Sequence, residues 1–141
     1  MPKTKTLTLD LSRVIAAPPV EAYDAWMDPA RPCNPWNHCK KLILSPKVDG
    51  LFFILGRHGN GVPHFGRFTA LARGRGLKHT WMSPVTRGLE TEVTVRFKKQ
   101  GLGTLMTLRH SGLPDDELGR THQAGWTFLM GLLEKQFRSK R

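Results

Sequence analysis

The chain is poor in cysteine and acidic residues and has no long hydrophobic run. Cys33 and Cys39 are its only cysteines among 141 residues. No further ligands stand near them at a recognisable metal-binding spacing. We therefore expect two reduced thiols, no metal site and no cofactor. No apolar stretch is long enough to span a membrane or to form a secretory signal, so a cytoplasmic location is the default expectation.

The shortage of acidic residues leaves a strong positive charge. Eleven acidic residues oppose 22 lysines and arginines, which gives a formal net charge of +11. Such a balance suits nucleic acid or another anionic surface. The basic residues are scattered over turns and termini, however, and no zinc-finger, helix–turn–helix or stacked-aromatic pattern accompanies them. We interpret the charge as solvated surface and expect no specific nucleic-acid partner.

The chain does contain enough apolar material for one packed core. Hydrophobic residues make up 39% of it, with four Trp and seven Phe. Its length is typical of one domain, and no linker-like tract or internal repeat divides it. We predict that residues 1–141 form a single domain.

Short strands are predicted over most of the chain. Alternating apolar and polar residues predict strands over 7–15, 42–44, 51–55, 65–72, 77–82, 91–97 and 104–110. Pro19 suits the first turn of a short helix that ends before Pro29. Residues 29–36 are predicted to form a second short helical turn or an irregular loop. Hairpin-length connections make the sheet antiparallel.

A short turn after His110 leads into one long amphipathic helix. Asp115 and Asp116 lie near its start, where free backbone N–H groups favour negative charge. The apolar face of the helix repeats at three- and four-residue spacing: His122, Trp126, Leu129, Leu133 and Phe137. Neither this face nor the inner face of the sheet is stable in water, so the two must pack together. A sheet that curls around the helix would leave a pocket beside it.

Several segments, taken in order, resemble a known family. They are residues 13–19 and 22–29, Asp49-Gly50 followed by Phe52, Gly66-Arg67-Phe68, residues 77–81, Gly103-Thr104, residues 110–114 and residues 122–126. Together they resemble the START-like (SRPBCC) superfamily, and more narrowly the branch named for the activator of the heat-shock-protein-90 ATPase homologue. Two positions depart from that branch. Trp36 stands alone where the branch usually has paired Trp, and Asp49 replaces one of two usual glycines.

The resemblance implies an α+β helix-grip fold, also called START-like or birch-pollen-allergen-like. In this fold a curved seven-stranded antiparallel sheet wraps around the long C-terminal helix, and two short helices follow the first strand. An apolar cavity lies between sheet and helix. The branch has no shared catalytic motif, so the resemblance assigns no catalytic residue.

Strand parity and the helix face select the residues expected to contact a ligand in that cavity. They are Trp36, Phe52, Phe68, Trp81, Val95, Met106, Leu108, His110, His122, Trp126 and Met130. Large apolar side chains at such positions also serve as plain core. The two histidines are the polar exceptions, because a buried imidazole demands hydrogen-bond partners. We hypothesise that His110 and His122 form a polar end within an otherwise apolar pocket.

We predict that the protein binds a small hydrophobic or amphipathic molecule in the cavity. One alternative is a co-chaperone-like protein-interaction module, which would contact a chaperone through its surface. A second alternative is a cyclase- or hydrolase-type enzyme that uses the cavity. The enzyme reading is disfavoured, because an acid–base pair would need Asp115 or Asp116 beside the histidines and Ser111 lies in no nucleophile motif. An exposed edge strand could pair two copies, so we expect a monomer or weak dimer.

Overall fold

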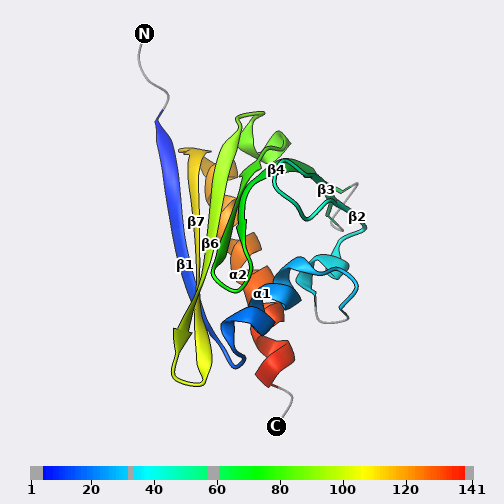
Figure 1. Ribbon diagram of the computed structural model, residues 1–141. Helices are drawn as coiled ribbons and strands as arrows, with labels where there is room; N and C mark the ends of the chain where they lie inside the picture. The colour runs from blue at the N-terminus through cyan, green and yellow to red at the C-terminus, as the bar shows by residue number, and fades with distance from the viewer. Residues whose placement is uncertain (1–4, 32–33, 57–60, 139–141) are drawn as a thin grey trace.

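Seven antiparallel strands form one sheet in a computed structural model that describes residues 5–31, 34–56 and 61–138. Strands β2 to β7 lie side by side in chain order, and β1 lies beside β7. The strands are β1 (Thr6–Ile15), β2 (Lys41–Leu44), β3 (Leu51–Leu55), β4 (Pro63–Ala72), β5 (Gly76–Trp81), β6 (Thr91–Gln100) and β7 (Gly103–Pro114). The sheet curves around the long helix α2 (Glu117–Arg138), as Figure 1 shows. This confirms the predicted sheet and C-terminal helix.

One α-helix rather than two follows β1. It is α1 (Pro19–Met27), which has proline at its first turn as expected. The second short helix is a single 3₁₀ turn, η1 (Pro35–His38). Its start is fixed by Asn34, whose side-chain oxygen accepts a hydrogen bond from the backbone N–H of Trp36 at 2.8 Å. A further 3₁₀ turn that the pattern did not predict, η2 (Pro84–Thr86), follows β5.

Strand β7 is longer than predicted, and the expected turn after His110 is absent. The strand continues to Pro114 because β1 pairs along it, with Thr6 opposite Pro114. Helix α2 then begins after only two more residues. The carboxylate of Asp116 accepts a hydrogen bond from the backbone N–H of Gly119 at 2.9 Å and so caps the helix, in keeping with the acidic residues expected at its start.

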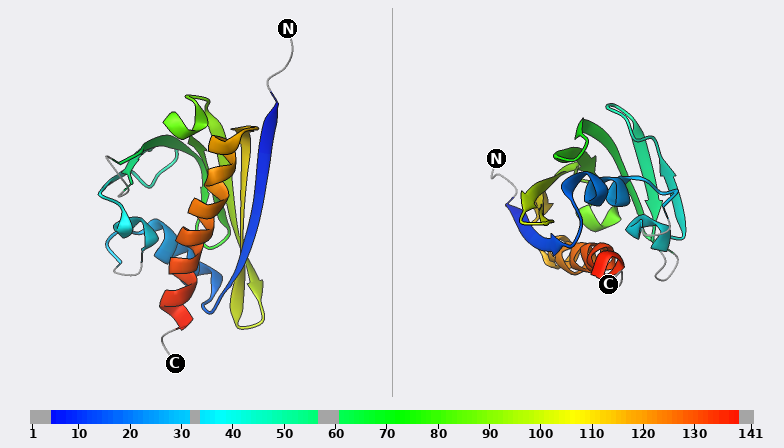
Figure 2. Two further views of the ribbon diagram at one scale, coloured as in Figure 1. Left: turned by 180° about the vertical axis from the view of Figure 1, so that it is seen from behind. Right: turned by 60° about the horizontal axis from the view of Figure 1, so that its bottom comes forward.

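The buried residues of β3 to β7 include every strand residue predicted to contact a ligand. They include Phe52, Ile54, Phe68, His79, Trp81, Thr91, Val93, Val95, Phe97, Met106, Leu108 and His110. The buried positions of α2 recur at three- and four-residue spacing: Gly119, His122, Trp126, Met130, Leu133 and Phe137. These two surfaces pack together in the core. Figure 2 shows α2 lying against the concave side of the sheet.

Helix α2 lies to one side of the sheet's concave face. It packs chiefly against β1 and makes smaller contacts with β7, α1, η1 and η2. Arg13 of β1 forms an ion pair with Glu134 of α2, with 2.8 Å between nitrogen and oxygen. Strands β3 and β4 are not among its main partners, which leaves room between them and the helix. Within the described residues, no helix has the length and apolar character needed to cross a membrane.

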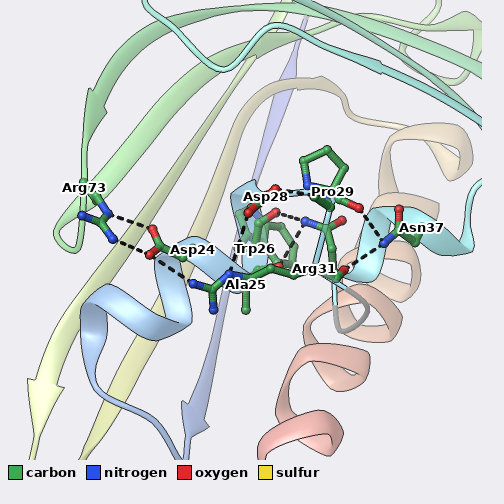
Figure 3. A network of polar contacts seen from close by, with 10 residues as sticks. Asp24, Ala25, Trp26, Asp28, Pro29, Arg31, Asn37 and Arg73 are labelled. Atoms are coloured by element: carbon green, nitrogen blue, oxygen red, sulfur yellow. Dashed lines mark hydrogen bonds and ion pairs between the residues drawn. The ribbon is translucent and has the colours of Figure 1, made fainter.

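Polar contacts tie α1 and the following loop to the sheet (Figure 3). The Asp24 carboxylate accepts hydrogen bonds from Arg73, in the β4–β5 turn, at 3.0 and 2.7 Å, and from Arg31 at 3.5 Å. The hydrogen bond from Arg73 lowers the pKa of Asp24. The side-chain N–H groups of Asn37 donate to the carbonyls of Pro29 and Arg31, both at 3.0 Å. These contacts fix the segment that carries η1.

Candidate ligand-binding site

A cavity of about 460 Å³ lies between α2 and the β3–β5 side of the sheet. Helix α2 forms one wall, which includes Gly125 and Leu129, and the sheet forms the other, which includes Ile54 and Trp81. Trp36 of η1 and Val85 of η2 also line it, together with Cys39. Cys33 lies outside the described residues. The walls are mainly aliphatic and aromatic, so the cavity suits an apolar occupant.

The eleven residues expected to contact a ligand fall into three groups. Trp36, Trp81, His122 and Trp126 line the cavity. Phe52 and Phe68 line only a separate void of about 20 Å³, which is room for about one water molecule. Val95, Met106, Leu108, His110 and Met130 line neither space and are at most 1% exposed. The hollow therefore lies beside α2, while the region directly between α2 and the sheet is filled by side chains.

His110 has both ring nitrogens occupied by protein groups. Trp126 Nε1–H donates to His110 Nδ1 at 3.0 Å, so the ring proton lies on Nε2. That Nε2–H donates to the Thr91 hydroxyl at 2.7 Å, and the hydroxyl donates to the carbonyl of Trp81. Burial, assisted by repulsion from other histidines, lowers the pKa of His110 to about 2. His110 thus positions Trp126 against the sheet and has no nitrogen left for a ligand.

His122 retains one nitrogen without a partner. Its Nδ1–H donates to the carbonyls of Leu118 and Gly119, one turn earlier on α2, at 3.2 and 3.1 Å. Nε2 therefore carries a lone pair, and it is buried with no hydrogen-bond partner. Burial lowers the pKa of His122, so the ring is neutral at pH 7. His122 lines the cavity, and its Nε2 is an unused acceptor buried just behind the cavity surface.

Two further ring nitrogens of the wall lack partners. Trp81 Nε1 and His64 Nδ1 are both buried without a hydrogen bond, and the two rings stack with centroids 4.6 Å apart. Across the described residues, these two atoms and His122 Nε2 are the complete set of buried, unpartnered side-chain nitrogens and oxygens. All three belong to residues that line the cavity. Buried polar groups are normally paired, so their concentration here marks a polar region of the wall.

The described residues of the cavity wall carry no charge at pH 7. No Asp, Glu, Lys or Arg is among its described lining residues, although the chain has a net charge of +11. Burial, with a smaller contribution from His122, lowers the pKa of His64 to about 4. The histidines of the wall are therefore neutral, and the cavity offers hydrogen bonds rather than ion pairs.

Neither of the two aspartates considered as partners of the histidines lines the cavity. Asp115 forms an ion pair with Arg120 at 3.3 Å, and Asp116 pairs with Arg87. The carboxylate–histidine pair that an acid–base mechanism would require is not formed among the described residues.

Among the wall residues absent from the predicted site, His64 is the one that brings an unpartnered polar atom. The predicted strand begins at Phe65, whereas β4 begins at Pro63. His64 shares strand parity with Phe68, which is predicted to contact a ligand, so a strand begun two residues earlier would have included it. The Gly and Asn residues just before it favoured a loop and concealed this signal.

The curved sheet, the single long helix and the cavity beside that helix define a protein of the START-like, helix-grip fold. The chain belongs to the family described as "Activator of Hsp90 ATPase homolog 1-like protein", whose model matches residues 16–138. This confirms the branch that the sequence resembles. A comparison with curated proteins gives no match.

Solved structures share this fold. The chain is similar to protein MLL2253 from Mesorhizobium loti, with a TM-score of 0.75, 22% identity and coverage of 96% of this chain and 99% of that one. It is similar to protein CV1439 from Chromobacterium violaceum, with a TM-score of 0.72, 21% identity and coverage of 92% and 96%. The structure of Ara h 8.0201 gives a TM-score of 0.76 at 9% identity, with coverage of 96% and 100%. At these identities the likeness shows the fold alone.

Proposed function

We propose that this protein binds a small, mainly apolar molecule in the cavity between α2 and the β3–β5 side of the sheet. The supporting observation is a cavity of about 460 Å³ with mainly apolar walls, far larger than the neighbouring void of about 20 Å³. Ligand pockets typically measure roughly 300–1,000 Å³ and combine apolar walls with a few polar groups. Burial of apolar ligand surface, at about 25 cal/mol per Å², drives binding against the ordering cost.

Gly125 offers a way to fill the cavity without disturbing the core. It lines the cavity from α2, and a Cβ built on it meets no atom within 4 Å. A phenylalanine at this position would extend from an unobstructed site into or across the hollow. Gln123 is exposed on the same helix and does not line the cavity, so Gln123→Phe is the matched control.

The test is a titration with the neutral fluorescent probe N-phenyl-1-naphthylamine. We expect the wild type and Gln123→Phe to bind the probe with a Kd on the order of 1–10 μM. Gly125→Phe should bind at least about tenfold more weakly, with an unchanged thermal unfolding midpoint or a higher one. Equal binding by Gly125→Phe would show that the probe sits elsewhere and would contradict the proposal.

The family's name suggests a second candidate, contact with a chaperone. An exposed row of apolar side chains on the outer face of the sheet favours it. Ile43 lies opposite Phe53, Phe53 lies opposite Phe65, and Phe65 pairs with Met82 across strand ends. Ile43 and Phe65 are 55% and 41% exposed. Such a row can receive an apolar segment of a partner protein.

Lys41 and Arg67 share the outer face with this row and are exposed. An apolar segment with acidic flanks therefore complements it best. The test is calorimetry with a purified chaperone of the Hsp90 type. Binding by the wild type that is lost in Ile43→Ser/Phe65→Ser and kept in Gly125→Phe would support this role. Absence of wild-type binding would remove it.

A further inference from the structure

We propose that the cavity selects uncharged ligands that carry a hydroxyl group, which is held by a hydroxyl subsite formed by His64, Trp81 and His122. This inference rests on the proposed ligand binding and adds the chemical class of the ligand. It starts from the three unpartnered nitrogens, all of which belong to residues of the cavity wall. Trp81 and His122 are 4% and 7% exposed, so solvent outside the cavity does not satisfy them.

The three nitrogens offer complementary hydrogen-bonding roles. Trp81 Nε1–H can only donate. His122 Nε2 can only accept, because its Nδ1–H is directed to the carbonyls of α2. His64 Nδ1 takes either role according to its tautomer. A hydroxyl both donates and accepts, so it can pair with any of the three, whereas an ether or ketone oxygen can pair with Trp81 but not with His122.

Charged groups match the subsite poorly. A carboxylate would face the lone pair of His122 Nε2 in a cavity with no Lys or Arg among its described lining residues. An ammonium group would find no carboxylate among those same residues. Burial of an unpaired charge costs far more than burial of a neutral polar group. The lining therefore discriminates by charge as well as by hydrogen-bonding role.

Hydrogen bonds formed here should contribute strongly to affinity. Each nitrogen has less than 1 Å² of accessible surface, so its water was lost when the protein folded. A ligand hydroxyl that reaches one of them, once neighbouring side chains of the wall move apart, removes an unsatisfied buried group and displaces no water bound to that nitrogen. We expect about a tenfold gain in affinity for a well-placed hydroxyl.

The test uses four probes that share one ring system, measured by calorimetry at pH 7.5. They are naphthalene, 2-naphthol, 2-methoxynaphthalene and 2-naphthoate. We expect 2-naphthol to bind about tenfold more tightly than naphthalene. The methoxy compound, which can only accept, should fall between them, and the anionic 2-naphthoate should bind most weakly.

Single substitutions assign the effect to atoms. His122→Phe should reduce the advantage of 2-naphthol over naphthalene from about tenfold to about threefold, and Trp81→Phe should remove the advantage of 2-methoxynaphthalene. His79→Phe is the matched control, because His79 is buried on the same strand as Trp81, donates to the Thr80 carbonyl and does not line the cavity. Ratios between probes within one variant cancel any change in the folded fraction.

The outcomes separate this inference from the proposed function. If none of the four probes binds the wild type, cavity binding itself fails. If all four bind equally, cavity binding stands and the hydroxyl subsite is wrong. Tightest binding of 2-naphthoate would overturn the subsite. A preference for 2-naphthol that survives both His122→Phe and Trp81→Phe would do the same.

Discussion

Acid should unfold this protein at a pH set by its buried histidines. Burial lowers the pKa of four of them: to about 4 for His64 and His79, to about 2 for His110, and in the same direction for His122. In the unfolded chain each returns to its ordinary value near 6.5. Between pH 6 and pH 4 the unfolded state therefore binds up to four more protons than the native state.

The magnitude follows from linkage. A lowered histidine pKa leaves stability complete above pH 6.5 and removes it as the pH falls below that value, at up to about 1.4 kcal/mol per pH unit for each group. For His79, which is 4% exposed, the loss continues to about pH 4 and totals roughly 3 kcal/mol. The three groups whose pKa falls to about 4 or lower, His64, His79 and His110, together remove up to about 4 kcal/mol per pH unit, and His122 adds a loss in the same direction. A native stability in the lower half of the usual range of about 5–15 kcal/mol is then exhausted within about two to three pH units below neutrality.

Urea unfolding at pH 7, 6 and 5, followed by tryptophan fluorescence, measures this dependence. The urea midpoint should fall progressively as the pH is lowered. In His79→Phe the fall should be smaller, because the contribution of one histidine to the pH-dependent loss of stability is removed. Asp24 and Asp116 also have lowered pKa values, but their contributions are lost only below about pH 4 and do not enter this range. A urea midpoint that stays constant from pH 7 to pH 5 would refute the reasoning.

Three substitutions in α2 test its packing by the same urea titration at pH 7. Gly125→Ala should stabilise the protein by about 1 kcal/mol, or about 3 °C in Tm, because the new Cβ meets no atom within 4 Å and glycine weakens a helix interior. Gly119→Ala should destabilise the protein by at least about 2 kcal/mol, because a Cβ at residue 119 would lie 1.9 Å from the Pro114 carbonyl oxygen. Equal stability of Gly125→Ala and Gly119→Ala would contradict the packing described. Trp126→Phe should cost at least about 1–3 kcal/mol, because it leaves His110 Nδ1 buried without a donor, and a neutral effect would show that the hydrogen bond is dispensable.

The architecture was largely accessible from the sequence because its signals are local and repeated. Alternation along residues 91–97 can bury only one face of a strand, and the three- and four-residue spacing from His122 to Phe137 can bury only one face of a helix. The ends of elements were less accessible, since they depend on partners far along the chain. Strand β7 reaches Pro114 only because Thr6 and Leu7 pair with its last residues.

Asp49 shows how a departure from the family pattern is accommodated. It has a φ of 66°, in the left-handed region that favours glycine, which accounts for the glycine usual at this turn. Its backbone N–H donates to the Phe68 carbonyl at 2.8 Å, so the turn stays attached to β4. Aspartate tolerates this conformation better than most residues do, and the fold is preserved.

The polar end of the site could be predicted only in part. Alternation along the strand places His110 on an inward face, and helical spacing does the same for His122. Which hydrogen bonds their ring nitrogens form, however, depends on side chains from other elements. The Trp126 N–H and the Thr91 hydroxyl occupy both nitrogens of His110, whereas His122 meets only carbonyls of its own helix. No spacing along one strand encodes that difference. The location of the hollow was equally hidden, because it depends on α2 packing toward β1.

The hydrogen bonds that join Trp126, His110, Thr91 and Trp81 run from α2 across β7 and β6 to the end of β5. They connect two residues on opposite walls of the hollow, so the separation of these walls is fixed at that point. Strands β3 and β4 have no comparable attachment to α2 among the described contacts. A bulkier ligand would therefore displace β3 and β4 outward and leave the spacing between α2 and β5 unchanged. Amide hydrogen exchange in β3 and β4 would detect this movement.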